Sequence, residues 1–326
     1  NINNGEFTNT GIVSGYSVEI KGQNFNLVNT ENGTIVAADD RYPYGAGNII
    51  ITANKVDNKG NIRTGGTGDE NNITITAETL NNIGYILAQK GNITANSNGA
   101  LVNSGEIIAD KNVTIKGKTE TITNKGGGKI GGQNITIESD GRFINYGMVA
   151  AMEKVFVHVN NFLNAGYNPE GASLLQEYLE SFYALSGESQ ESAEKMLKEL
   201  EAQLQSATGT EKEAIQAKIT NMKAVIEDLK KLNEKLASLD FGVITGKNVE
   251  IKTKATGTKD GLINSGVIKG DESLKLNSSS FIKNDGVLES GKNMDITATG
   301  DVTNANRIYA GEKLTVTGKS FTSTGE

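Results

Sequence analysis

The chain has 326 residues, with 39 Gly, two Pro, one His and neither Cys nor Trp. The lack of Cys excludes disulfides and thiolate metal sites, and one His cannot build a multi-histidine metal site. A net charge of −7 disfavours nucleic-acid binding, which needs a basic face against the phosphates. The chain contains no phosphate loop or dinucleotide fingerprint, so we expect no cofactor. Its apolar runs, such as 148–152, are too short for membrane insertion.

A five-residue phrase recurs along the chain: an apolar residue, any residue, Asn, any residue and Gly. The copies begin at Phe7, Leu27, Val56, Leu80, Leu101, Ile122, Phe143, Phe162, Leu262, Ile282, Val302 and Phe321. The copies at Leu27, Val302 and Phe321 are imperfect. Successive starts lie 19–29 residues apart, except for one step of 100 residues. The spacing predicts a repeat of about 20 residues that is interrupted by one insertion of about 80.

Each copy has the same interior. A short apolar pair and then an alternating triplet follow the Gly, as in Ile107-Ile108 and Val113-Thr-Ile115. Alternation with period two is typical of a strand with one buried face. Three short strands in about 20 residues predict one coil of a parallel β-helix, and the coils must stack to bury their apolar faces. We therefore expect an all-β parallel β-helix with an inserted antiparallel α-helical hairpin.

The Asn of each copy stands two residues after an inward apolar position, so on a strand it also points inward. A buried polar side chain is costly unless its hydrogen bonds are made. Amides stacked one coil apart can bond to one another, which predicts a structural ladder at a corner; a row of ligand-binding amides is the alternative. The predicted ladder consists of Asn9, Asn29, Asn58, Asn82, Asn103, Asn124, Asn145, Asn164, Asn264, Asn284 and Asn304, with Ser323 in the last copy.

Asn-Ile-Thr phrases at Asn72, Asn92 and Asn134, and Asn112-Val-Thr, match the pattern for N-glycosylation. The repeat generates these phrases automatically, with Asn at a turn and Thr outward. They are therefore weak evidence for modification.

Two coils have long turns. The turn at 36–44 holds Arg41, Tyr42 and Tyr44 around a Pro, which is a candidate contact patch for a sugar or a protein. Alternatively, these tyrosines cover the edge of a coil. The Gly-rich turn at 64–70 has a weak likeness to a calcium-binding nonapeptide, but it occurs once and breaks the spacing, so we expect no metal there.

The composition changes between 172 and 240, which hold only two of the 39 Gly and are rich in Glu, Lys, Leu and Ala. We expect one helix to start at Ser189 or Ser192, and a second, capped by Thr210, to reach about Leu239. The apolar residues of the second helix follow a coiled-coil spacing, which predicts an antiparallel hairpin. They are Ile215, Ile219, Met222, Ile226, Leu229 and Leu236.

The expected organisation is N-terminal coils at 1–166, the hairpin insertion within one coil at 167–242, and C-terminal coils at 243–326. A shorter helix is expected at 174–185, at the base of the hairpin. Candidate contact residues in the insertion are Tyr178, Tyr183, Lys195 and Lys223.

We expect no enzymatic activity. Glycan-cleaving β-helices gather carboxylates and basic residues in one groove over successive coils. Here Asp271, Asp285 and Asp295 occupy different phases of the repeat, so they do not stack. The single His158 is expected on an outward position of its strand, as a surface or hairpin-packing residue rather than a catalytic base.

Residues 101–115, Leu-Val-Asn-Ser-Gly-Glu-Ile-Ile-Ala-Asp-Lys-Asn-Val-Thr-Ile, resemble the repeats of filamentous haemagglutinin-type exoproteins. This family comprises long bacterial adhesins and related contact-dependent inhibition proteins that use two-partner secretion. The resemblance covers everything except the insertion. It implies a right-handed parallel β-helix, a secreted or cell-surface location in a Gram-negative bacterium, and attachment to a protein or glycan receptor on host cells or other bacteria. It also implies export through an outer-membrane transporter, which the lack of Cys fits.

Two features depart from the family. The Asn-Pro-Asn phrases of its secretion domain are absent, so the chain corresponds to the shaft, and no family binding residue maps onto the hairpin. The expected function is a non-enzymatic segment of a large adhesin. The alternatives are a purely structural shaft of a contact-dependent inhibition or haemolysin-type exoprotein and, third, a β-helical polysaccharide-acting enzyme.

Overall fold

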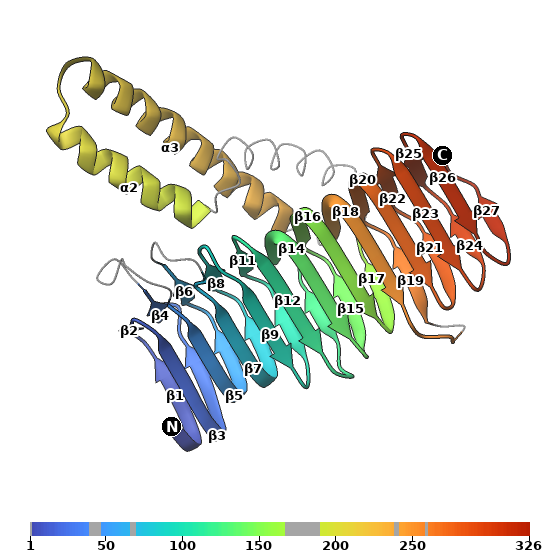
Figure 1. Ribbon diagram of the computed structural model, residues 1–326, viewed down its shortest axis with the longest axis horizontal. Coiled ribbons are helices and arrows are strands. Elements are labelled where there is room, and N and C mark those ends of the chain that lie inside the picture. Colours follow the sequence, from blue (N-terminus) through green and yellow to red (C-terminus); the bar gives the residue numbers. More distant parts are fainter. Residues whose placement is uncertain (1, 39–46, 66–69, 167–189, 238–240, 258–259) are drawn as a thin grey trace. The chain divides into compact units, whose positions relative to one another are not determined.

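The computed structural model describes residues 2–38, 47–65, 70–166, 190–237, 241–257 and 260–326. It is a parallel β-solenoid of about 13 turns of about 21 residues, with two helices inserted (Figure 1). The predicted parallel β-helix with a helical insertion is thereby confirmed. The chain divides into two compact units, one formed by 1–167 and 240–326 and the other by 168–239.

The strands form three files, which we name after the sequence signature that they carry. The Asn file contains β1 (Ile2–Asn9), β10 (Leu101–Asn103), β13 (Ile122–Asn124), β15 (Arg142–Asn145), β17 (Asn161–Asn164), β19 (Gly261–Asn264), β21 (Phe281–Asn284), β24 (Val302–Asn304) and β27 (Phe321–Ser323). The pair file contains β2 (Ile12–Gly15), β4 (Thr34–Ala37), β6 (Asn61–Thr64), β8 (Tyr85–Ala88), β11 (Glu106–Ala109), β22 (Val287–Ser290) and β25 (Arg307–Ala310). The triplet file contains β9 (Ile93–Ser97), β12 (Asn112–Gly117), β23 (Asn293–Ala298) and β26 (Lys313–Thr317).

The remaining strands are longer and run through a corner from one file to the next. Those that join the triplet file to the Asn file are β3 (Val18–Asn29), β5 (Ile49–Asn58) and β7 (Ile73–Asn82). Those that join the pair file to the triplet file are β14 (Lys129–Ser139), β16 (Met148–Val159), β18 (Val243–Thr253) and β20 (Val267–Ser278).

Every repeated phrase stacks on its own counterpart in the next coil, because the strands pair in parallel and in register. Asn103, for example, pairs with Asn82 on one side and Asn124 on the other. The register continues across the insertion, where Phe162 pairs with Leu262 and Val155 with Val249. The coil that carries the hairpin therefore resumes in phase, as predicted.

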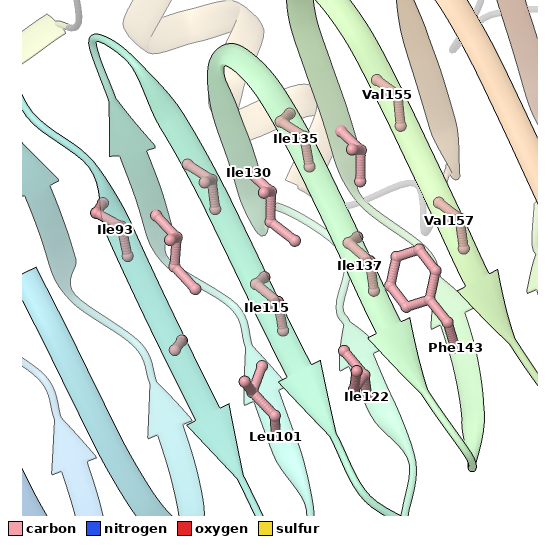
Figure 2. Close-up of a cluster of buried hydrophobic side chains, with 14 of the residues drawn as sticks. Ile93, Leu101, Ile115, Ile122, Ile130, Ile135, Ile137, Phe143, Val155 and Val157 are labelled. Atoms are coloured by element: carbon pink, nitrogen blue, oxygen red, sulfur yellow. The ribbon is translucent and has the colours of Figure 1, made fainter.

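The core fills the space between the files with aliphatic side chains. In each triplet the two apolar residues point inward and the middle one points outward, so Val113 and Ile115 are fully buried while Thr114 is not. Figure 2 shows neighbouring coils, in which residues such as Ile115 and Ile137 form continuous inward rows. β-Branched side chains suit this pleated surface, and stacking closes the apolar face that one coil leaves open.

The helical unit contains α2 (Gln190–Ser206) and α3 (Gly209–Ala237), which pack against each other. Ile219 and Ile226 on α3 are buried, which confirms part of the predicted seam. Two ion pairs also link the helices, Lys223 to Glu201 at 2.7 Å and Lys230 to Glu194 at 3.1 Å.

The predicted start of the second helix needs correction. Helix α3 begins at Gly209, so Thr210 lies inside its first turn instead of capping it. The Lys212 amide lies 3.5 Å from the Thr208 carbonyl, so the helical hydrogen bonds begin one to two residues earlier than we expected. Helix α2 begins at Gln190, directly after Ser189, and Ser192 lies inside it.

Several predicted features lie outside the described residues. They are the helix at 174–185 with Tyr178 and Tyr183, the residues Arg41, Tyr42 and Tyr44, the last residues before the predicted end at Leu239, and most of the Gly-rich turn at 64–70. Lys195 lies in α2, but its side chain is not among those described.

Candidate functional site

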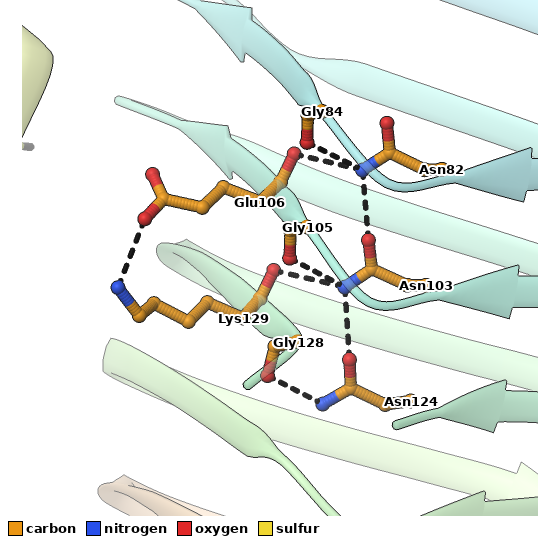
Figure 3. Close-up of polar contacts among 8 residues, drawn as sticks. All are labelled: Asn82, Gly84, Asn103, Gly105, Glu106, Asn124, Gly128 and Lys129. Carbon is orange, nitrogen blue, oxygen red and sulfur yellow. Dashed lines mark hydrogen bonds and ion pairs between the residues drawn. The ribbon is translucent and has the colours of Figure 1, made fainter. Parts of the chain in front are cut away.

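The predicted Asn ladder is confirmed as an unbroken chain of side-chain hydrogen bonds. Each amide donates from Nδ2 to Oδ1 of the Asn in the next coil, over 2.7–2.9 Å from Asn9 to Asn304. Figure 3 shows the part of the ladder formed by Asn82, Asn103 and Asn124. Asn304 donates to Ser323 Oγ at 3.0 Å. All eleven asparagines are buried, at most 6% exposed.

The second amide hydrogen of each ladder residue goes to the backbone. Nδ2 of Asn103 lies 3.2 Å from the carbonyl oxygen of Lys129 in the next coil and 3.1 Å from that of Gly105 in its own turn. Since both hydrogens are used inside the protein, the ladder has no donor left for a ligand. Its role is to satisfy a buried polar corner.

Glycines form a second stack where each coil turns beside the ladder. A Cβ added to Gly105 would lie 2.0 Å from the carbonyl oxygen of Gly84, so only Gly lets the turns approach this closely. In two coils the stacked glycine is not the Gly of the repeated phrase. The turn is longer there, and Gly128 and Gly242 occupy the position that Gly126 and Gly166 would have in a short turn. The stack consists of Gly33, Gly60, Gly84, Gly105, Gly128, Gly147, Gly242, Gly266 and Gly286.

The hairpin is inserted at this same turn. The backbone hydrogen bond that joins the two ends of the insertion also joins the ends of short insertions in other coils. The Gly33 amide donates to Thr30 at 2.8 Å and the Gly128 amide to Lys125 at 2.9 Å, in each case across two extra residues. The Gly242 amide makes the equivalent bond to Ala165 at 2.7 Å, across residues 166–241. Phe241 and Gly242 thus belong to the solenoid unit, although we had assigned them to the insertion.

A second ladder of asparagines lies on the outer side of the triplet file, at one end of strands that contain the Asn-Ile-Thr phrases. Here the later Asn donates to the earlier one: Asn92 to Asn72 Oδ1 at 2.9 Å, Asn112 to Asn92 at 2.8 Å, and Asn134 to Asn112 at 2.9 Å. The direction is opposite to that of the buried ladder. Sequence reasoning missed this ladder, although the recurrence of these phrases every 20–22 residues was its signal.

Five side chains gather on the outer face of β16 and β18, the strands on either side of the insertion. The ammonium groups of Lys154 and Lys252 lie 5.2 and 5.6 Å from the centroid of the Phe156 ring. The Glu250 carboxylate bonds both, at 3.2 Å to Lys154 and 2.7 Å to Lys252. His158 lies on the outward side of its strand, as predicted, with its ring 6.0 Å from that of Phe156.

The pKa of Glu250 in this cluster and that of Asp140 outside it are both below their ordinary values. Partial burial raises the pKa of Glu250, but the hydrogen bonds and charges of Lys252 and Lys154 outweigh it and hold that pKa below its ordinary value. A 2.6 Å hydrogen bond from Lys254 and its charge lower the pKa of Asp140. This cluster could not be found by sequence reasoning, because Phe156 and Glu250 become neighbours only across the insertion.

The structure places two more of the residues singled out from the sequence. Lys223 lies on α3 in the ion pair with Glu201, so its charge is already matched inside the hairpin. The three aspartates do not stack, since Asp295 lies opposite Lys275 rather than Asp271.

Within the described part of the chain, no group of three or more His, Cys, Asp or Glu side chains is placed to hold a metal ion. None of the helices in the described ranges combines the length and apolarity needed to span a membrane. Comparison of the chain with protein-family models, with curated proteins and with solved structures finds no match.

Proposed function

We propose that this chain is a non-enzymatic segment of a large secreted or surface-exposed bacterial adhesin, whose solenoid carries an inserted hairpin for attachment to host cells or other bacteria. The observation that carries the proposal is the junction at Ala165 and Gly242. The backbone hydrogen bond between Gly242 and Ala165 spans 76 residues, and the same bond spans only two residues in the turns at Gly33 and Gly128. The solenoid therefore accepts a separate unit without changing its own register. A scaffold of this kind suits the display of a binding element.

The resemblance of the repeats to filamentous haemagglutinin-type exoproteins supports the setting. It leads us to propose a location outside a Gram-negative cell, export through an outer-membrane transporter, and a protein or glycan receptor. The absence of Cys is compatible with that route, because no disulfide would block passage of an unfolded chain.

The test is to remove the hairpin without disturbing the solenoid. Residues 166–241 are replaced by Glu-Asn, so that Ala165-Glu-Asn-Gly242 copies the natural turn Thr30-Glu31-Asn32-Gly33. Circular dichroism should show an intact β-solenoid, and binding to epithelial cells and to bacterial cells is then compared with the intact chain. We expect binding by the intact chain and at least about tenfold weaker binding by the deletion, as for loss of a whole contact surface.

If both proteins bind equally, attachment lies on the solenoid and the proposed role of the hairpin is wrong. If neither binds, the attachment function is overturned. The purely structural shaft of an inhibition or haemolysin-type exoprotein then becomes the better interpretation.

A further inference from the structure

One backbone hydrogen bond recurs at the turn that follows each ladder residue from Asn29 onward. The residue directly after the ladder residue donates its amide to the carbonyl oxygen of the ladder Asn in the preceding coil, over 2.6–3.0 Å. The donors are Thr30, Lys59, Ile83, Ser104, Lys125, Tyr146, Ala165, Ser265, Asp285, Ala305 and Thr324. The bond is the same in a short turn, as at Ser104, and in a long one, as at Ala165. The residue after the ladder Asn therefore belongs to the solenoid in all these coils.

A second backbone hydrogen bond fixes the other side of the turn. The residue after the turn glycine, the Gly that ends each of these turns, donates to the carbonyl oxygen of the turn glycine in the preceding coil, over 2.7–3.2 Å. The donors are Thr34, Asn61, Tyr85, Glu106, Lys129, Met148, Val243, Val267, Val287 and Arg307. Val243 makes this bond directly after the insertion, at 2.8 Å. Both sides of the turn are thus fixed, and only the link between them differs from coil to coil.

The turn glycine changes its acceptor when this link lengthens. In short turns the amides of Gly84 and Gly105 make long bonds of 3.1 and 3.2 Å to the ladder carbonyl of the preceding coil. In the long turns the amides of Gly33, Gly128 and Gly242 instead bond the residue after the ladder Asn of their own coil, over 2.7–2.9 Å. Lengthening the link therefore exchanges one hydrogen bond for another, and the glycine amide keeps an acceptor.

The position of the glycine decides where added residues fit. In the three long turns, a Cβ on the turn glycine would lie 2.2–2.5 Å from Oδ1 of the ladder Asn in the same coil. Any side chain there would displace the amide on which the buried ladder depends. Added residues must therefore come before the glycine and not after it.

We propose that the link between the residue after the ladder Asn and the turn glycine is an insertion site in every coil that has this glycine. The solenoid then accepts further folded units at short turns, such as that between Ser104 and Gly105. Because the turns stack, such units would be attached along one edge at multiples of about 4.8 Å. The inference goes beyond the proposed function, since it concerns where any unit can be attached and holds whether or not the hairpin binds cells.

The test adds a second copy of residues 166–241 to the intact chain, between Ser104 and Gly105. A matched control places the same residues one position later, between Gly105 and Glu106, so that the Phe241 of the added copy takes the place of the turn glycine. Circular dichroism shows whether the added hairpin forms its helices in both proteins. Hydrogen exchange followed by mass spectrometry measures the protection of β7 and β13, the strands on either side of β10 in the Asn file.

We expect the first variant to keep the protection of the intact chain in β7 and β13. In the control, protection should fall at least about tenfold, because a side chain is forced against the ladder. The proposal is overturned if the first variant loses protection as the control does. It is also overturned if the control keeps its protection, because the glycine would then not define the site. Neither result depends on cell binding, so failure of this inference is distinct from failure of the proposed function.

Discussion

The solenoid and the hairpin differ in how far apart in the sequence their contacting residues lie. In the solenoid each buried amide bonds a residue in the next coil, 19–29 positions away and, across the insertion, 100 positions away. In the described part of the hairpin, α2 packs against α3 and two ion pairs link the two helices. A defect in one coil should therefore disturb its neighbours on both sides, whereas a defect in the hairpin should stay inside it.

The largest loss of stability is expected from replacing a turn glycine, and the loss should differ between the two units. Gly105→Ala would place a methyl group against the backbone of the preceding turn, so we expect a loss of about 3 kcal/mol or more in the free energy of unfolding of the solenoid. Gly209→Ala has open space around it but keeps φ positive, so we expect a loss of about 1–2 kcal/mol, confined to the hairpin. Urea unfolding followed by circular dichroism measures both. Equal losses would show that close packing between successive turns is not the reason why Gly105 must be a glycine.

The next effect compares the middle of the buried ladder with its first member. Asn103→Ala removes the acceptor of Asn82 and the donor to Asn124, and we expect a loss of about 3 kcal/mol. Asn9→Ala breaks the bonds that Asn9 donates to Asn29 and Thr34 and a long one that it accepts from the Gly11 amide, but it leaves no ladder Asn without its acceptor, so about 1 kcal/mol should be lost. Chemical denaturation gives both values. The idea of a cooperative ladder fails if the two variants lose the same amount.

A core substitution in the hairpin should leave the solenoid unchanged. Ile226 is 5% exposed on α3, so Ile226→Ala should cost the helical unit about 2–4 kcal/mol. Hydrogen exchange followed by mass spectrometry resolves the two units: protection should fall in 190–237 and stay constant in the coils. A parallel fall in the coils would mean that the two units unfold together.

The smallest effect is the pH dependence of the charged cluster. Since its folded-state pKa is lowered, Glu250 stabilises the fold above the ordinary Glu pKa of about 4.3, and this contribution disappears as the pH falls through the folded-state pKa. Between pH 7 and pH 3 the intact chain should lose more stability than Glu250→Gln, by less than about 1 kcal/mol because the pair is partly exposed. Melting temperatures across that range measure the difference. Identical pH dependence of the two proteins would show that ionised Glu250 does not stabilise the fold.

The recurring phrase was sufficient to predict the solenoid and its buried ladder, because apolar and Asn positions at a fixed spacing leave few alternatives for a stack of coils. It failed for the turn residues Gly128 and Gly242, since a turn can lengthen while the strands keep their register. The outer cluster could not be predicted, because Phe156 and Glu250 are separated by the hairpin in sequence and become neighbours only in the folded stack.

Because every amide of the buried ladder donates toward the C-terminal neighbour, the two faces of a coil are chemically unlike. The leading face presents amide hydrogens and the trailing face presents amide oxygens, so an added coil can be accepted in only one orientation. Each coil supplies the acceptor for the Asn of the coil before it. A coil that slipped out of register would leave the amide hydrogens of the preceding Asn without acceptors, so the ladder penalises misregistered coils.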